Sequence, residues 1–165
     1  MSNSLPVIIQ GGMGIAVSNW ELAKTVSMQG QLGVVSGTAI DNVMARRLQD
    51  GDLSGNTRRA LAHFPNQEVV ARILAKYFVE GGKAADAPYV MVPKITLEQK
   101  RDAQEILIAA NFVEVWLAKE GHDGLIAVSA AGPPITSTGT EPTSNFAILR
   151  ISFGSSRGIP APMIM

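Results

Sequence analysis

Hydrophobic residues follow two alternating patterns over residues 1–48. Runs rich in β-branched residues, with no polar alternation, occur at 6–10 and 32–37 and are typical of strands buried on both faces of a parallel sheet. After each run, apolar residues recur at helical spacing: Leu22, Ala23 and Val26, then Val43, Met44 and Leu48. The order β-α-β-α with short connections predicts an α/β fold with parallel strands.

Residues that favour helix ends bound these two helices. Ser18 and Glu21 form a capping-box pattern, and Gly30 is a favourable residue at a helix C-terminus. Asp41 or Asn42 can cap the second helix. The first helix is therefore expected to begin near residue 18 and to stop near residue 30.

The middle of the chain, residues 52–110, is more polar and its pattern is helical. Asn66 can cap one helix, and Thr96–Gln99 is a second capping-box pattern. The helix that follows it carries Ile106, Leu107 and Ala110. Two later runs, 112–117 and 125–128, predict further strands.

The composition changes after residue 128. Residues 129–165 are rich in Ser, Thr, Pro and Gly, and Glu141, Arg150 and Arg157 are their only charged residues. One strand-like run occurs, at 146–151. We expect an irregular C-terminal tail with features of disorder.

Two of the predicted strands end in segments suited to ligand binding. The first runs into residues 11–14 (Gly-Gly-Met-Gly), and the second ends in Ser36-Gly37-Thr38. Such a glycine loop can present backbone amides to a phosphate, and the carboxyl ends of parallel strands share one edge of the sheet. A dinucleotide fingerprint does not fit, because Val17 stands at the third glycine position and no acidic residue follows the second strand.

Charge and composition exclude several classes of function. The chain has 14 basic and 14 acidic residues, so we expect neither a nucleic-acid partner nor a polybasic membrane surface. It has no cysteine, which excludes disulfides and thiolate metal sites, and we predict no metal. No secretory signal is evident, and no apolar run approaches the roughly 20 residues of a membrane span. The sequence predicts a cytoplasmic protein.

Four segments carry a resemblance to a known family. Residues 6–14, 18–23 and 30–37 resemble the opening of the FMN-dependent nitronate monooxygenases (2-nitropropane dioxygenases), and 111–122 resembles a stretch of one subgroup. Members of this family are (β/α)₈ TIM barrels that oxidise alkyl nitronates with O₂, and relatives include NAD(P)H-dependent enoyl-thioester reductases. The subgroup has a helical insertion after the second strand, which would account for residues 52–110.

The resemblance implies an FMN site at the glycine loop. The residues that would face the flavin are Gly11, Gly12, Met13, Gly14, Ser36, Gly37 and Asn111. Glu114 and Lys119 are weaker candidates beside a later strand.

The catalytic base is left unassigned. His122, flanked by glycines, resembles the family's catalytic histidine, although a histidine in such a place more often caps a strand end. His63 is expected to interact with a helix C-terminus, and Trp20 and Trp116 to pack in the core.

The length of the chain limits what this site can do. A complete barrel typically needs about 250 residues, so at 165 residues we expect residues 1–128 to form the N-terminal part of a barrel, without the later phosphate-binding loops. An open parallel edge favours a homo-oligomer that covers it. Unless two copies complete a barrel, we expect weak flavin binding and little turnover.

Two other classes of function stay open. One is a non-catalytic nucleotide-binding α/β module, such as a flavodoxin-like one, and the other is an interaction protein that acts through helices 57–110.

Overall fold

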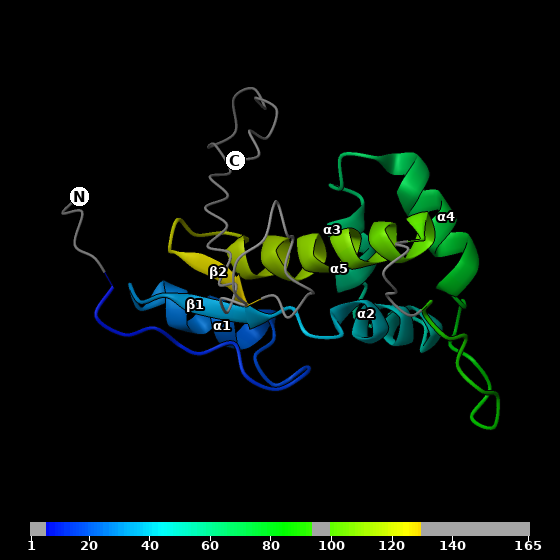
Figure 1. Cartoon of the computed structure of the whole chain (residues 1–165), viewed down its shortest axis with the longest axis horizontal. Coiled ribbons are helices and arrows are strands. Elements are labelled where there is room, and N and C mark those ends of the chain that lie inside the picture. Colours follow the sequence, from blue (N-terminus) through cyan, green and yellow to red (C-terminus); the bar gives the residue numbers. More distant parts are fainter. Residues whose placement is uncertain (1–5, 94–99, 130–165) are drawn as a thin grey trace, which may run out of the picture.

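A two-stranded parallel sheet and one long helix organise the part of the chain that the computed structural model describes, residues 6–93 and 100–129 (Figure 1). Within those residues the fold is mixed α/β. In chain order the elements are α1 (Trp20–Met28), β1 (Gly33–Ser36), α2 (Ile40–Gln49), α3 (Asn56–Leu61), α4 (Gln67–Tyr77), α5 (Arg101–Lys119) and β2 (Ile126–Ser129).

The sheet joins segments that are far apart in the sequence. β1 pairs in parallel with β2, in a register that runs from Gly33 opposite Ile126 to Ser36 opposite Ser129. The strands predicted at 32–37 and 125–128 are thereby confirmed. A parallel pair needs a crossover connection, and here α2, α3, α4 and α5 all lie between the two strands.

The segment 6–10 differs from its prediction. It forms one parallel bridge, between Ile9 and Leu32, rather than a strand, and it is not buried on both faces. Ile8 and Ile9 are 60% and 65% exposed, whereas Val35 of β1 is 1% exposed. The pattern of β-branched residues predicted a buried strand here, but only Ile9 pairs, and none of the described residues covers the segment.

Helix α5 replaces the strand predicted at 112–117. The buried residues of α5 recur at helical spacing; they include Ile106, Ala109, Ala110, Val113 and Leu117. All five belong to one hydrophobic cluster, which continues the helix predicted around residue 106 as far as Leu117. Because tertiary packing overrides β propensity, the β-branched valines of this stretch lie in a helix.

Helix α5 also joins the two parts of the core. One cluster is formed by α2, α3, α4 and α5, and a smaller one by α1, the two strands and the C-terminal half of α5. Trp20 packs against both clusters, as predicted for a core residue. In Figure 1, α5 runs from the sheet toward α4.

The helix starts were predicted with mixed success. Asn66 caps α4 by accepting a hydrogen bond from the Val69 amide, as expected. The cap of α1 is Asn19, whose side chain accepts from the Leu22 amide, so the capping box predicted at Ser18 and Glu21 is wrong. α2 begins at Ile40 after Ala39, without a side-chain cap, so the caps predicted at Asp41 or Asn42 are wrong. Thr96–Gln99 and the tail from residue 130 lie outside the described residues.

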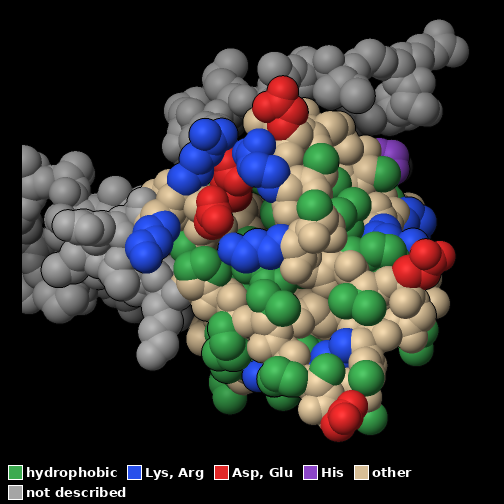
Figure 2. All heavy atoms as spheres, turned by 90° about the vertical axis from the view of Figure 1, so that its right-hand side faces the viewer, with side chains coloured by type: hydrophobic (Ala, Val, Ile, Leu, Met, Phe, Trp, Pro, Cys, Tyr) green, Lys and Arg blue, Asp and Glu red, His purple; other side chains and the backbone are tan. Residues whose placement is uncertain are grey.

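Ion pairs link α4 to the start of α5. Arg72 donates two hydrogen bonds to the Glu105 carboxylate, and Arg101 donates a third. These donors lower the pKa of Glu105, with the Arg72 hydrogen bond as the largest cause. Figure 2 shows acidic and basic side chains side by side on this end of the molecule. Exposed pairs of this kind contribute about 0–1 kcal/mol each to the free energy of unfolding. We therefore expect the buried face of α5 to contribute more than these pairs.

The packing of α5 can be tested with two isoleucines on the same helix. Ile106 is 1% exposed and Ile108 is 60% exposed. We expect Ile106→Ala to lower the free energy of unfolding by about 2–5 kcal/mol, because it leaves a cavity. Ile108→Ala should change it by less than about 0.5 kcal/mol. Urea unfolding followed by circular dichroism measures both, and equal losses would contradict the helical assignment of this face.

Candidate functional site

The glycine loop, the end of β1 and the end of β2 meet at the carboxyl edge of the sheet. The Ser129 hydroxyl donates a hydrogen bond to the Gly12 carbonyl at 2.9 Å. The Gly37 amide donates to the Ser129 carbonyl at 2.8 Å. The candidate segments 11–14 and 36–37 are therefore brought together, and Ser129, which the sequence did not single out, joins them.

Ser18 holds the glycine loop in place. Its hydroxyl donates to the Gly11 carbonyl and accepts from the Met13 amide, both at 3.1 Å. Its own carbonyl accepts from the Ser36 amide at 2.8 Å. The residue that resembled a helix cap instead ties the loop to β1. An isolated S-x-x-E pattern does not distinguish these two roles.

Close packing disfavours a side chain at two of the candidate glycines. A Cβ atom on Gly12 would lie 2.2 Å from the Ser129 hydroxyl oxygen. A Cβ atom on Gly37 would lie 3.0 Å from the Asn111 side-chain oxygen and 3.0 Å from the Ser129 carbonyl. Asn111 belongs to α5 rather than to a strand, yet it lies against the end of β1. Packing of the loop and of β1 against their neighbours thus accounts for part of the glycine content that suggested a ligand site.

The outer part of the loop is open to solvent. Gly11 and Gly14 are exposed, and the Met13 side chain is 72% exposed. Ser36 and Gly37 are buried, and Asn111 is half-buried. The candidate set contains no charged side chain. Such a surface of backbone, thioether and amide fits one face of a flat, neutral ring, but it offers a phosphate no cationic side chain.

Behind the loop, Glu114 on α5 is a buried carboxylate with two partners. It is 1% exposed. It accepts a hydrogen bond from the Trp20 amide at 2.9 Å, and it forms an ion pair with Arg47 of α2. Glu114 therefore does not point into the candidate ligand surface. It fixes the first turn of α1, which begins two residues after Ser18.

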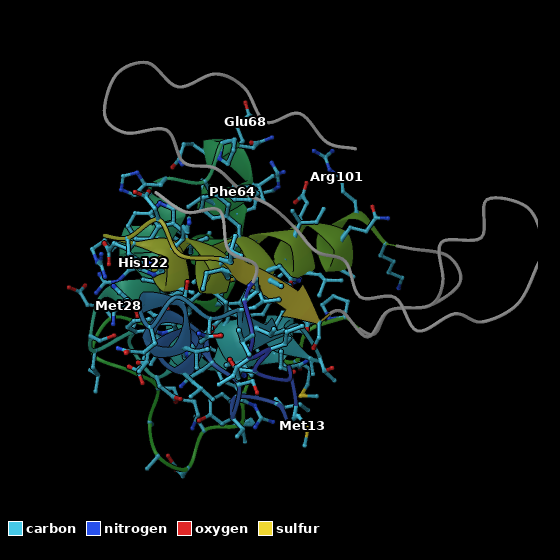
Figure 3. The ribbon with its side chains drawn as sticks, turned by 90° about the vertical axis from the view of Figure 1, so that its left-hand side faces the viewer. Met13, Met28, Phe64, Glu68, Arg101 and His122 are labelled. Atoms are coloured by element: carbon cyan, nitrogen blue, oxygen red, sulfur yellow. The ribbon has the colours of Figure 1, made fainter. Side chains whose placement is uncertain are left out.

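His122 and Lys119 lie at the opposite, amino edge of the sheet, just before β2. The His122 Nδ1 accepts from the Gly124 amide, and Nε2 contacts the Ala118 carbonyl at 2.6 Å, so both ring nitrogens are held by backbone. Lys119 donates to the Gly124 carbonyl, and burial lowers the pKa of its amine. Figure 3 shows Met13 and His122 well apart. The geometry is that of a capped helix end.

His63 and Trp116 form a stacked pair. Their ring centroids lie 4.6 Å apart with an interplanar angle of 17°. His63 directly follows α3, and Trp116 lies on α5. The pair packs α3 against α5, which leaves neither ring at the carboxyl edge of the sheet.

A separate pocket of about 400 Å³ lies between the start of α1 and the connection from α2 to α3. Arg47, Asp50 and Asp52 are among its lining residues, and none of the candidate flavin residues is.

Residues 6–93 and 100–129 contain no group of three or more acidic, histidine or cysteine side chains that could hold a metal ion. No helix formed by these residues is long and apolar enough to cross a membrane.

The close contact between Gly12 and Ser129 generates a test of the loop. We expect Gly12→Ala to lower the free energy of unfolding by about 1–3 kcal/mol, because the added methyl group overpacks the contact. Gly11→Ala is the matched control, since a Cβ atom there meets nothing closer than the Met13 side chain at 3.4 Å. Ser129→Gly should recover part of the loss in the double variant. Strictly additive losses in a double-mutant cycle would show that the two residues do not touch.

The buried ion pair generates a second test. Arg47→Ala leaves the Glu114 carboxylate with the Trp20 amide as its remaining donor. We expect a loss near the lower end of about 3–5 kcal/mol, because the Arg47 side chain is 31% exposed. Arg72→Ala, which breaks a surface pair, should cost about 0–1 kcal/mol. Thermal unfolding of the two variants compares them directly, and an equal cost would contradict the account of a buried charge.

Comparison with known proteins assigns no family to this chain. No protein-family model, no curated protein and no solved structure matches it. The resemblance to the nitronate monooxygenases thus stays a hypothesis.

Proposed function

We propose that the carboxyl edge of this sheet is a flavin site, and that the chain is an FMN-dependent oxidoreductase of the nitronate monooxygenase type. The observation that supports it most is the convergence of three separate segments at one edge: the loop 11–14, the end of β1, and Ser129. Ligands of parallel α/β folds bind at this edge. Both ring nitrogens of His122, the other candidate for chemistry, contact backbone groups at the opposite edge.

Each residue of the site has a distinct part in the proposal. The exposed backbone of Gly11 and Gly14 and the Met13 side chain would contact one face of the isoalloxazine ring. Ser36, Gly37 and Asn111 would form the floor behind the loop. The chemistry at such a site is flavin chemistry, in which electrons leave an alkyl nitronate and O₂ finally accepts them. No described residue is assigned as the base.

The proposed architecture is the first part of a TIM barrel. The extended segment at Ile9, β1 and β2 run parallel and adjacent, as the first three strands of a barrel do. The helices between β1 and β2 take the place of the insertion that the resemblance implies. An NAD(P)H-dependent enoyl reductase would use the same edge, so the architecture supports a flavoprotein without separating these two activities.

Flavin binding gives the test. We expect the purified chain to bind FMN weakly, with riboflavin bound within about threefold of FMN, a difference below about 1 kcal/mol. The reason is that the described residues of the site offer the ring a surface but offer the phosphate no cationic side chain. Quenching of flavin fluorescence on titration with protein measures both affinities.

Two methionines provide the matched control. Met13 is 72% exposed in the loop, and Met28 is 62% exposed at the end of α1, toward the other edge (Figure 3). Met13→Ala should weaken riboflavin binding at least about fivefold, which is about 1 kcal/mol, and Met28→Ala should leave it unchanged. A folded wild-type chain that binds neither flavin refutes the proposal. FMN bound far more tightly than riboflavin would overturn the ring-recognition account.

A further inference from the structure

The N-terminal segment carries an exposed apolar surface on the sheet side of the molecule. Its exposed side chains, here called the apolar strip, are those of Val7, Ile8, Ile9, Met13, Ile15 and Val17. They are between 51% and 89% exposed. Isolated exposed apolar residues are ordinary, but contiguous ones mark an interaction site. Every large apolar residue from 7 to 17 belongs to the strip.

The strip also lies on an open edge of the sheet. Leu32 of the neighbouring chain segment bonds to the Ile8 carbonyl and the Gln10 amide. Alternate residues of a strand point their backbone groups to opposite sides, so the N–H and C=O of Ile9 face away from β1. Within residues 6–93 and 100–129, neither group has a hydrogen-bond partner. Unpaired edges of this kind are templates for another strand.

The backbone of this segment is held in position before any partner arrives. The Gln31 side-chain oxygen accepts from the Val7 amide at 3.0 Å and from the Ile8 amide at 2.7 Å. The Gln10 side chain bonds to both the amide and the carbonyl of Val34. A preorganised edge loses little conformational entropy on pairing.

The charge of the segment restricts its partner. Residues 6–19 contain no charged side chain, and the whole chain has a formal net charge of zero. A charged partner surface would lose hydration here without gaining an ion pair. A second copy of this chain brings an identical uncharged strip, an identical open edge and no net repulsion.

We propose that the apolar strip is a self-association surface, where two copies of this chain pair about a twofold axis. In this isologous arrangement the edge at Ile9 of one copy pairs in antiparallel orientation with the edge at Ile9 of its partner. The strips cover each other, and Met13 comes to lie at the margin of the interface. The proposal does not depend on flavin binding.

The test compares three full-length variants with the wild-type chain by sedimentation velocity over a range of concentrations, without flavin. The wild-type chain is expected to show a reversible monomer–dimer equilibrium. The double variant Val7→Asp/Ile9→Asp should weaken the dimer at least about tenfold, because it buries like charges. Ile9→Pro should also weaken it, because proline removes the outward N–H.

Leu53→Asp is the matched control. Leu53 is 87% exposed but lies in the connection between α2 and α3, outside the apolar strip. This variant should keep the wild-type dimerisation constant. Far-ultraviolet circular dichroism of all four proteins checks that the helices are intact. A wild-type chain that is monomeric at every concentration overturns the proposal, as does a double variant that dimerises like wild type.

Discussion

The buried carboxylate of Glu114 is the contact on which the rest of this structure depends. It joins α5 to Arg47 of α2 and to the first amide of α1 at Trp20. Removing a carboxylate from water costs on the order of several kcal/mol unless its partners are in place, so the three helices are fixed relative to one another. Because Ser18 precedes α1 by two residues and holds the glycine loop, this buried charge also sets the position of the candidate site.

The two edges of the sheet have different roles. At the amino edge, backbone groups engage His122 and Lys119 and close the turn between α5 and β2. At the carboxyl edge, glycines allow close approach to Ser129 and Asn111, and the outer loop stays open. From the open surface of neutral groups we infer a ring-shaped ligand. From the apolar strip beside it we infer binding of a second copy of the chain.

Much of the fold could be predicted from local pattern. The runs at 32–37 and 125–128 and the cap at Asn66 were predicted correctly, because the signal for each, a β-branched run or a capping side chain, is local in the sequence. The stretch 112–117 was predicted wrongly as a strand, because its helical state depends on packing against residues far away in the chain. For the same reason the sequence did not reveal the bond of Ser129 to Gly12, which spans 117 positions. The convergence of the loop with the end of β1 was predictable, since parallel strands share an edge.

Hydrogen–deuterium exchange with and without riboflavin is the strongest test of flavin-ring binding at the carboxyl edge. We expect slower exchange of amides in residues 11–18 and 36–38 when riboflavin is present, with no change around the pocket lined by Arg47 and Asp52. Slower exchange at that pocket alone would place the ligand elsewhere. An unchanged exchange pattern at saturating riboflavin would contradict the claim.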